Sequence, residues 1–491
     1  MSGLALLGLV MLIVMIGAIF IGFPISFTLL FLALAFGYFG LGETVFSLAY
    51  FQTIGMMKEE LLAAVPLFIL MGYVTEQAGL MERLFIALRL LLAPIRGSLY
   101  AVVILTATIF AMATGIVGAA VTVLGIMASP IMIKAGYDGR LSAGCITAGG
   151  TLGILIPPSV MLIVMGPVLG VSVADLYASA FGPGFLLAGI YLAYLLGRAF
   201  LNPKLGPPVP IEERVHSAAV IVREVVIGVV PLVCLIAAAL GSILAGIATP
   251  TEASGVGALG AIVLAAAYRR LTYSGFKRAL LATTATSSMV LLLAVTSNIF
   301  GAVFSRLGTA SWITKTMLAL PLPPIAMLVL IIILIFLLGW PFEWPAIVLV
   351  FLPIFYPVIE ALKPALAAAL GISPEFVMVW FGALVAVTLQ TAFLSPPVAM
   401  SAYYLRQVVR EWSLATIYKG MFEFMILQCI AIAVMIAFPV IATGFPEQLR
   451  EEARGVKTEQ IDDSANRLEE DPLKAVPERP EEPGPKSDEK G

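Results

Sequence analysis

Charged residues are scarce in this chain of 491 residues. Only 12% of the residues are Asp, Glu, Lys or Arg, whereas 60% are hydrophobic. A soluble domain carries about 25% charged and about 45–50% apolar residues, so this chain lacks the polar surface that a soluble protein of its length would need. The composition therefore excludes an ordinary cytosolic enzyme and a nucleic-acid-binding protein.

Cysteine and histidine are nearly absent as well. Cys145, Cys234 and Cys429 are far apart, show no metal-ligand spacing and lie in apolar stretches, so we expect inert buried thiols. The single histidine, His216, lies in a charged loop and is expected at the surface. These absences exclude a disulfide-stapled secreted fold. They also argue against a histidine metal site, a histidine-based catalytic triad and an intramembrane enzyme.

The chain does contain a series of apolar stretches of about 20 residues, each long enough to cross a hydrocarbon core about 30 Å thick. An outer-membrane barrel would show short alternating strands instead. We therefore predict an all-α polytopic membrane protein. The predicted spans cover residues 4–21, 24–41, 61–78, 175–197, 224–247, 254–268, 279–305 and 414–442, an interfacial arm covers 43–60, and longer apolar blocks cover 99–134, 141–168, 323–361 and 375–405.

Each of the four longer blocks is interrupted by glycine or proline. The interruptions are Gly115–Gly118, Pro157-Pro158, Gly339–Pro341 and Ser395–Pro397. A helix interrupted in lipid exposes unpaired backbone groups at a large energetic cost, so breaks persist only where protein or an aqueous cavity satisfies those groups. A single proline could merely kink a packed helix, but breaks in two matched pairs favour a binding site.

Basic loops give these blocks an orientation. Lys and Arg flank block 99–134 at both ends, so the positive-inside rule places both ends in the cytoplasm and predicts a re-entrant hairpin. Counting onward, block 323–361 enters from the opposite face, and both termini lie outside. A hairpin followed by a broken helix thus occurs twice with opposite orientation, as in the inverted repeats of secondary transporters. A channel is the alternative, but matched Pro-Pro breaks suit alternating access better.

The repeats suggest a division of the chain into six parts. The tail carries 14 acidic and 8 basic residues and is predicted to be disordered, because it has too little apolar surface to bury. The parts are N-terminal scaffold helices and arm (1–98), a first transport repeat (99–168), connecting scaffold helices (169–322), a second transport repeat (323–405), a C-terminal helix (406–446) and the acidic tail (447–491).

Oxygen-bearing side chains crowd the breaks. Free carbonyl groups at a break suit a sodium ion, and free N–H groups at half-helix N-termini suit a carboxylate. The hydroxyl and amide side chains that could assist are Thr151, Ser159, Thr388, Gln390, Thr391 and Ser395. The alternative for each hydroxyl is a hydrogen bond back to its own helix, which is the favoured interpretation for Thr388.

Glu343 is the one carboxylate at a break, inside the run Trp340–Trp344. A carboxylate within the membrane is a functional candidate, and its alternative role is to cap the returning half-helix. Glu252 looks like part of an ordinary helix start, and Glu423 like the partner of Lys419 one turn away. No Lys or Arg lies in the breaks, so a carboxylate substrate would be held mainly by backbone groups. The lack of basic residues also argues against an anion channel lined by basic rings.

Six short stretches combine into a specific pattern: Ile21–Ile25, Val65–Gly72, Lys134–Tyr137, Gly149–Ser159, Thr249–Glu252 and Ser395–Val398. With these stretches, the chain resembles the large membrane subunit (DctM, or M subunit) of tripartite ATP-independent periplasmic (TRAP) transporters. The resemblance spans about residues 1–445 and leaves out the acidic tail.

This resemblance implies a Na⁺-driven importer of small organic acids, such as a C4-dicarboxylate or a 2-oxoacid, in a bacterial inner membrane. It implies an elevator-type ion-transporter fold, distantly similar to the divalent-anion/Na⁺ symporters. It also implies two partners, a small four-span membrane subunit and a periplasmic binding protein, with no organic cofactor, no metal beyond Na⁺ and no nucleic acid. A stand-alone ion-coupled organic-anion symporter is the alternative.

The resemblance also places a Na⁺ site between each hairpin tip and the broken helix that follows. Candidates for the first site are Gly115, Gly118, Ala119, Gly150, Thr151 and Pro157. Candidates for the second are Gly339, Pro341, Glu343, Thr391, Ser395 and Pro396. Candidate substrate ligands are Thr151, Ser159, Gln390, Thr391 and Ser395. The first tip lacks the serine common in the family, and the second carries bulky aromatic residues. An ion at the first tip would therefore depend on backbone carbonyl groups. The aromatic residues at the second tip point to a different substrate subgroup, such as monocarboxylates or 2-oxoacids.

Overall fold

A computed structural model describes residues 3–208, 217–396 and 399–452 of the chain. These residues are helical almost throughout and contain no β-strand, and ten of their helices are long and apolar enough to cross a membrane. The prediction of an all-α polytopic membrane protein is therefore confirmed. The chain divides into two units, Met1–Phe445 and Pro446–Gly491, and the helices described next belong to the first.

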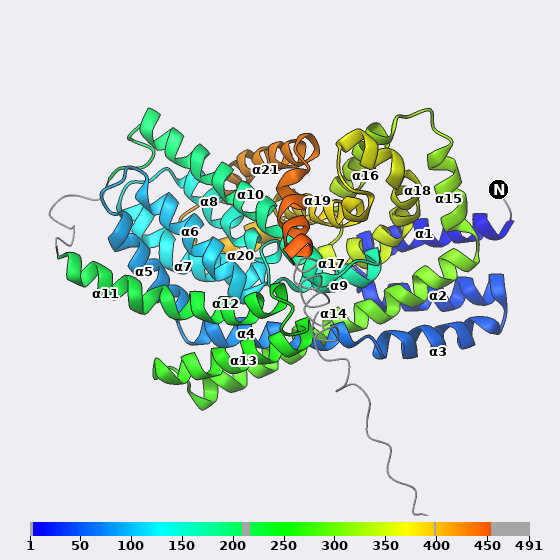
Figure 1. Ribbon diagram of the computed structural model, residues 1–491, viewed down its shortest axis with the longest axis horizontal. Coiled ribbons are helices and arrows are strands. Elements are labelled where there is room, and N and C mark those ends of the chain that lie inside the picture. The colour runs from blue at the N-terminus through cyan, green and yellow to red at the C-terminus, as the bar shows by residue number, and fades with distance from the viewer. Residues whose placement is uncertain (1–2, 209–216, 397–398, 453–491) are drawn as a thin grey trace, which may run out of the picture. The chain divides into compact units, whose positions relative to one another are not determined.

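Five helices, including the long helix α14, pack together at the N-terminal side of the fold (Figure 1). They are α1 (Gly3–Ile21), α2 (Ile25–Leu41), α3 (Thr44–Met57), α14 (Tyr273–Arg306) and α15 (Thr309–Leu318). Helix α14 contacts α2 and α3, and α15 contacts α1. Pro24 separates α1 from α2. It has an extended backbone conformation at the N-cap position of α2, and it lacks the N–H group that would continue α1.

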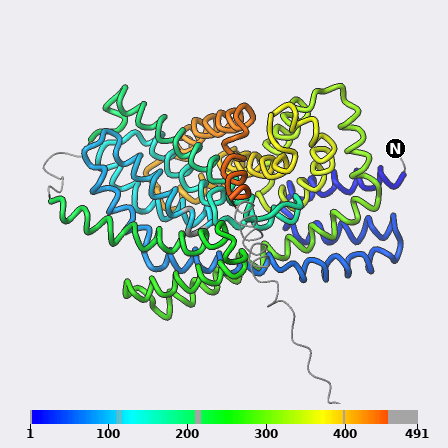
Figure 2. Tube along the Cα trace, viewed as in Figure 1, coloured from blue at the N-terminus to red at the C-terminus, as the bar shows by residue number. Residues whose placement is uncertain are grey.

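A second group of helices is built around α4, which contacts both α13 and α14. The group comprises α4 (Ala64–Gln77), α5 (Leu80–Leu92), α11 (Ala218–Gly228), α12 (Val230–Leu244) and α13 (Pro250–Ala267). Figure 2 shows α4 and α13 side by side although they are far apart in the sequence. The predicted span 224–247 is two helices, because Pro231 in the first turn of α12 cannot continue the hydrogen-bonding of α11.

The first repeat follows the predicted order closely. Its helices are α6 (Ser98–Thr114), α7 (Val117–Lys134), α8 (Gly139–Thr151) and α9 (Val160–Leu169), with a 3₁₀ turn over Leu152–Ile154. Only Gly115 and Ile116 separate α6 from α7. Gly115 has φ +60°, a left-handed conformation that glycine adopts without the strain a side chain would bring. Because α7 restarts at Val117, Gly118 is helical and the break is shorter than predicted.

The second repeat has the same order of elements. Its helices are α16 (Pro324–Leu338), α17 (Trp344–Ala346), α18 (Leu352–Leu370), α19 (Pro374–Leu394) and α20 (Met400–Val408), with a π-helical turn over Ile347–Phe351. Helix α18 runs nine residues beyond the predicted block 323–361, so most of the expected connection is helical. Pro397 and Val398 of the fourth predicted break lie outside the described residues.

The core lies between the repeats and the two remaining long helices, α10 (Val173–Leu201) and α21 (Leu414–Ala437). Every residue of α19 from Phe376 to Leu394 is buried, and α19 contacts both α10 and α21. Helix α21 also packs on α8 at a glycine pair. A Cβ on Gly144 would lie 2.9 Å from the Gly420 carbonyl carbon, so small residues are needed at this crossing.

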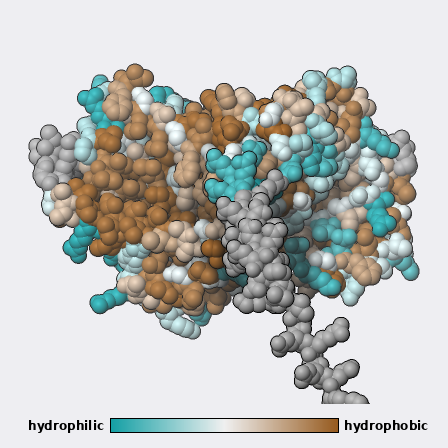
Figure 3. All heavy atoms as spheres, in the orientation of Figure 1, coloured by the Kyte–Doolittle hydropathy of each residue, from teal (hydrophilic) through white to brown (hydrophobic). Residues whose placement is uncertain are grey.

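The surface over α10 and α12 is apolar, as expected of a face that meets lipid (Figure 3). Phe185 of α10 is 51% exposed and Val233 of α12 is 44% exposed. The prediction of buried thiols holds for Cys145 but is wrong for Cys234 and Cys429, which are exposed. In a membrane protein an apolar stretch also faces outward, so apolar neighbours do not imply burial.

The predictions for the acidic tail and for His216 can be compared with the structure only in part. Residues 447–452, which composition assigned to the acidic tail, are helical. The rest of the tail and His216 lie outside the described residues.

Candidate functional site

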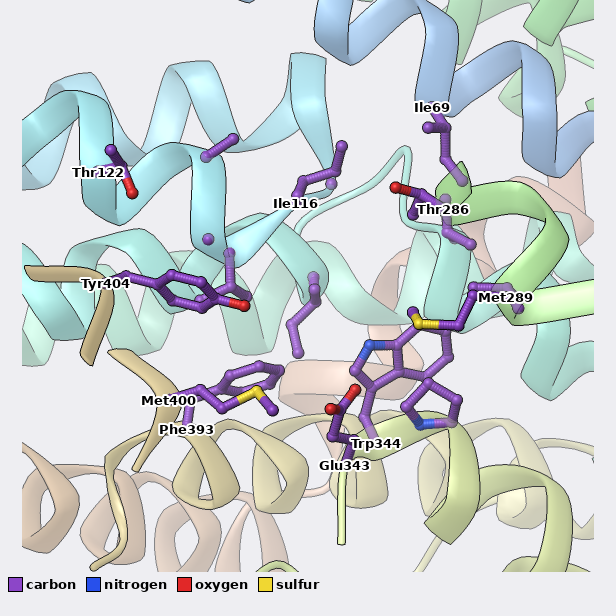
Figure 4. A pocket seen from close by; sticks show the side chains of 18 of the residues that line it. Ile69, Ile116, Thr122, Thr286, Met289, Glu343, Trp344, Phe393, Met400 and Tyr404 are labelled. Carbon is purple, nitrogen blue, oxygen red and sulfur yellow. The ribbon is translucent and has the colours of Figure 1, made fainter. Parts of the chain in front are cut away.

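Both hairpin tips line a single cavity of about 510 Å³. Residues of the first tip, the second tip, both broken helices and the packed helices α4 and α14 all contribute to it (Figure 4). The residues that line it include Gly115, Gly118, Glu343, Trp344, Tyr404, Tyr73, Glu76 and Thr286. The cavity therefore joins two breaks that are far apart in the sequence.

The first tip presents bare backbone to this cavity. Val117, Gly118 and Ala119 line it and precede the first hydrogen bond of α7, which Ala120 N donates to the Ile116 carbonyl oxygen at 3.2 Å. The N–H groups of a first helical turn have no partner within their own helix and attract anions. Gly118 has no side chain to cover them, so this end of the cavity suits a carboxylate.

Backbone carbonyl groups of the first broken helix converge on Gly115. A Cβ on Gly115 would lie 3.7 Å from the Pro158 carbonyl oxygen and 3.8 Å from that of Gly153. Carbonyl oxygens are hard ligands, and an alkali cation near such a break would need little help from side chains. Two backbone carbonyl oxygens therefore lie close to Gly115 at the first tip.

At the second tip, Glu343 occupies the N-cap position of α17, but its side chain makes no capping hydrogen bond. The carboxylate has no hydrogen bond or ion pair with any residue that the structure describes. It points into the cavity in Figure 4. The alternative prediction of an N-cap role is therefore not supported by the geometry. Gly339 of the same tip packs against α19, where a Cβ would lie 3.0 Å from that of Ala392.

Helices α4 and α14 supply lining residues that the sequence reasoning missed. The Tyr73 hydroxyl and the Thr286 hydroxyl are 3.0 Å apart and link the two helices at the cavity wall. Glu76 lies one turn beyond Tyr73 and also lines the cavity. A carboxylate inside the predicted span 61–78 was the signal that could have identified this helix.

The predicted hydroxyl ligands are buried but do not line the cavity. Thr151 donates to the Ala148 carbonyl oxygen at 2.8 Å, and Thr391 donates to that of Thr388 at 2.6 Å. These are the local back-bonds that were the alternative interpretation. In both repeats, therefore, a threonine near the break donates to the carbonyl oxygen of the residue three positions earlier in its own helix.

Three more candidate side chains lie near the breaks. Ser395 donates to the Thr391 carbonyl oxygen at 2.7 Å. Ser159 donates to the Ile154 carbonyl oxygen and caps α9. The Gln390 amide nitrogen lies 3.4 Å from the Ala386 carbonyl oxygen, while its side-chain oxygen is buried without a partner among the described residues.

Of the predicted site residues, the structure brings four to the cavity: Gly115, Gly118, Ala119 and Glu343. The others are outside its lining: Gly150, Thr151, Pro157, Ser159, Gly339, Pro341, Gln390, Thr391, Ser395 and Pro396. Gly150 has a packing role, because a Cβ there would lie 2.3 Å from the Val121 side chain of α7.

A second cavity of about 520 Å³ lies between α3, α9, α14 and α18. Gln52, Ser297 and Asn298 contribute polar groups to it. It contains no residue of either hairpin tip, so we take the first cavity as the candidate site.

Two other acidic residues have structural partners. Glu252 and Thr249 form a capping box at the start of α13, which confirms the predicted helix start. Glu423 pairs with Arg140 of α8 at 2.9 Å, so the predicted pairing with Lys419 is wrong. The Tyr194 hydroxyl also donates to Glu423, and a tertiary partner replaced the local one because α21 lies directly on α8.

The chain matches the family model of the tripartite ATP-independent periplasmic transporter, DctM component, over residues 10–441. It is 30% identical to the sialic acid TRAP transporter large permease protein SiaM of Vibrio cholerae, over 88% of this chain and 96% of that protein. It is 28% identical to the C4-dicarboxylate TRAP transporter large permease protein DctM of Pseudomonas aeruginosa, over 79% of this chain and 86% of that protein.

Two solved structures have a similar fold. The YdaH transporter of Alcanivorax borkumensis superposes with a TM-score of 0.55 at 17% identity, covering 82% of this chain and 90% of that one. MtrF of Neisseria gonorrhoeae gives a TM-score of 0.54 at 14% identity, covering 89% and 95%. Both are transporters, and at such identities they support the fold alone. The family match over most of the chain shows that it belongs to the DctM-component family of tripartite ATP-independent periplasmic transporters.

Proposed function

We propose that this chain is the large permease subunit of a Na⁺-coupled symporter that imports small organic acids across a bacterial inner membrane. The observation that carries the proposal is the single cavity in which the tips of both repeats meet. Relatives are named for sialic acid and for C4-dicarboxylates, which share a carboxylate. The first turn of α7 offers that group unpaired backbone N–H donors.

The coupling ions have backbone sites in this proposal. One Na⁺ lies at Gly115, where the Gly153 and Pro158 carbonyl groups converge. The other lies near Gly339, which packs against Ala392 on α19. Charge neutralisation by Na⁺ lowers the cost of bringing a carboxylate into a site of low dielectric constant, so ion and substrate bind together.

Movement of the two repeats relative to α4 and α14 would carry the cavity from one side of the membrane to the other, as an elevator. The cavity wall supports such a division, because Tyr73 and Thr286 lie on the packed helices while Gly118 and Glu343 lie on the repeats. The partners in this proposal are a small four-span membrane subunit and a periplasmic binding protein that delivers the substrate.

Uptake by the purified complex in proteoliposomes tests the proposal. Labelled C4-dicarboxylates, 2-oxoacids and sialic acid are offered to the large and small subunits with the binding protein outside. Uptake should require an inward Na⁺ gradient and should not survive its replacement by a K⁺ gradient. Equal uptake without Na⁺ would contradict the coupling, and equal uptake without the binding protein would favour a stand-alone symporter.

A further inference from the structure

The cavity is acidic. Glu343 and Glu76 line it, and no Lys or Arg is among the described residues that do. Neither carboxylate has a hydrogen bond or an ion pair with a described residue. Two unpaired carboxylates would repel a second carboxylate of the substrate, and the repulsion is strong where water is partly excluded.

Aromatic side chains line the cavity together with Glu343. Trp344 follows it in the chain, and Phe393 and Tyr404 line the same cavity. Figure 4 shows the three rings around the space into which Glu343 points. A carboxylate among aromatic faces is the chemistry that binds an ammonium group, through charge pairing and cation–π contact.

The opposite side of the cavity favours an anionic group. Ile116, which precedes the first turn of α7, lies across the cavity from Glu343 in Figure 4. That turn presents the unpaired N–H groups of Val117 and Gly118. The cavity is therefore bipolar, with backbone donors at one end and a carboxylate within aromatic rings at the other.

We propose that the substrate is a zwitterion, a small organic acid that also carries an ammonium group. Its carboxylate binds at the first turn of α7, and its ammonium group binds Glu343 between Trp344 and Tyr404. This inference rests on the proposed function and names its substrate class. The Na⁺ sites at the breaks use backbone oxygens, so they leave Glu343 free for the substrate.

The test compares ligands that differ only in an amino or a hydroxyl group. The pairs are alanine and lactate, aspartate and malate, and 4-aminobutanoate and 4-hydroxybutanoate. Binding is measured as the rise in thermal unfolding temperature of the purified large subunit in nanodiscs containing Na⁺. We expect the amino acid of at least one pair to bind about tenfold or more tightly than its hydroxy acid, which corresponds to about 1.4 kcal/mol.

Glu343→Gln should reduce that preference to within about twofold, because the carboxylate that selects the ammonium group is gone. Glu360→Gln on the exposed side of α18 is the control and should keep the preference. Trp344→Leu tests the same end of the cavity if Glu343→Gln does not fold. A preference that persists in both variants would overturn the assignment.

The outcomes separate this inference from the proposed function. Equal or tighter binding of the hydroxy acids in every pair would contradict the zwitterion and leave the organic-acid transporter intact. If none of the six compounds raises the unfolding temperature in Na⁺, the zwitterion assignment is contradicted, and the proposed function is then decided separately by the uptake of 2-oxoacids and sialic acid.

Discussion

The ring of Tyr404 lies directly against Gly118. A Cβ on Gly118 would lie 3.0 Å from the Tyr404 Cζ atom, which is tighter than nine in ten real Cβ contacts. Gly118 lies in the first turn of α7 in the first repeat, and Tyr404 lies on α20, the last helix of the second repeat. This contact is therefore where the two repeats meet at the cavity. Glycine leaves room here for both the ring and the exposed backbone, whereas a side chain would have to push the ring aside.

Gly118→Val should therefore abolish most substrate binding. The new side chain would displace the Tyr404 ring and cover the first N–H groups of α7, and we expect substrate affinity to fall about tenfold or more. Affinity of the purified subunit for a transported organic acid measures this. The double variant with Tyr404→Leu should recover part of the loss, and an unchanged affinity in Gly118→Val alone would show that the contact does not shape the site.

Gly115→Ala tests the first ion site. The substitution forces a side chain into a left-handed conformation, which costs about 1–2 kcal/mol, and tilts the tip away from the Gly153 and Pro158 carbonyl groups. Gly136→Ala is a matched control, because Gly136 has φ +76° and no other atom near its Cβ position. Both variants should lose similar stability, but only Gly115→Ala should raise the Na⁺ concentration for half-maximal uptake, by about fivefold or more.

The outline of both repeats could be predicted from the sequence because glycine and proline interrupt apolar stretches that are otherwise uniform. Gly115 and the Pro157-Pro158 pair mark positions where a helix is weakened, by the conformational freedom of glycine and by the missing N–H groups of proline. Which side chains face the cavity could not be predicted. A helix in lipid is apolar on all sides. The 3.6-residue alternation of apolar and polar residues that identifies the buried face of a helix in a soluble protein is therefore missing.

The role of the candidate hydroxyl groups could not be predicted from the sequence either. Thr391 and Ser395 were singled out as oxygen ligands, and each donates its hydrogen to a carbonyl group of its own helix. A back-bond occupies the hydrogen but leaves oxygen lone pairs, so sequence alone cannot separate a ligand from a back-bonded hydroxyl. Tyr73 and Thr286 were missed because they lie on two helices that are far apart in the sequence. No motif near either residue indicates that the two helices meet at the cavity.

Thr391→Ala and Ser395→Ala should weaken Na⁺ dependence if these oxygens assist the second ion site. We expect the Na⁺ concentration for half-maximal uptake to rise about fivefold in each, with little loss of expression. Thr388→Ala is the control, because Thr388 makes the same kind of back-bond to Leu384 at 2.8 Å and is equally buried. The same shift in Thr388→Ala would indicate a general effect on α19 instead of an ion site.

Glu423→Gln should destabilise the contact between α8 and α21. Glu423 pairs with Arg140 at 2.9 Å with its side chain only 19% exposed, so we expect a loss of about 1–2 kcal/mol in a double-mutant cycle with Arg140→Gln. The Glu360–Lys363 pair at 3.3 Å on exposed α18 should give less than about 0.5 kcal/mol. Unfolding in lipid–detergent mixtures measures both cycles, and equal coupling energies would argue against a structural role for the Glu423 pair.

Thr249→Ala tests the helix start of α13. Loss of the capping box should cost about 1 kcal/mol of stability. Uptake should stay near the wild-type rate because Thr249 and Glu252 lie outside the cavity lining. A large loss of uptake in a well-folded Thr249→Ala protein would assign this motif a functional role that its geometry does not indicate.

The central claim is that the cavity between the two hairpin tips is the transport site, and filling it tests that claim most directly. Thr122 lines the cavity on α7, and Ile126 lies one turn further along the same helix with 56% of its surface exposed. Na⁺-driven uptake is measured for Thr122→Trp and for Ile126→Trp, each reconstituted with its partner proteins. The cavity account predicts that Thr122→Trp loses uptake by about tenfold or more while Ile126→Trp stays within about twofold of wild type. Full Na⁺-driven uptake by a folded Thr122→Trp protein would contradict it.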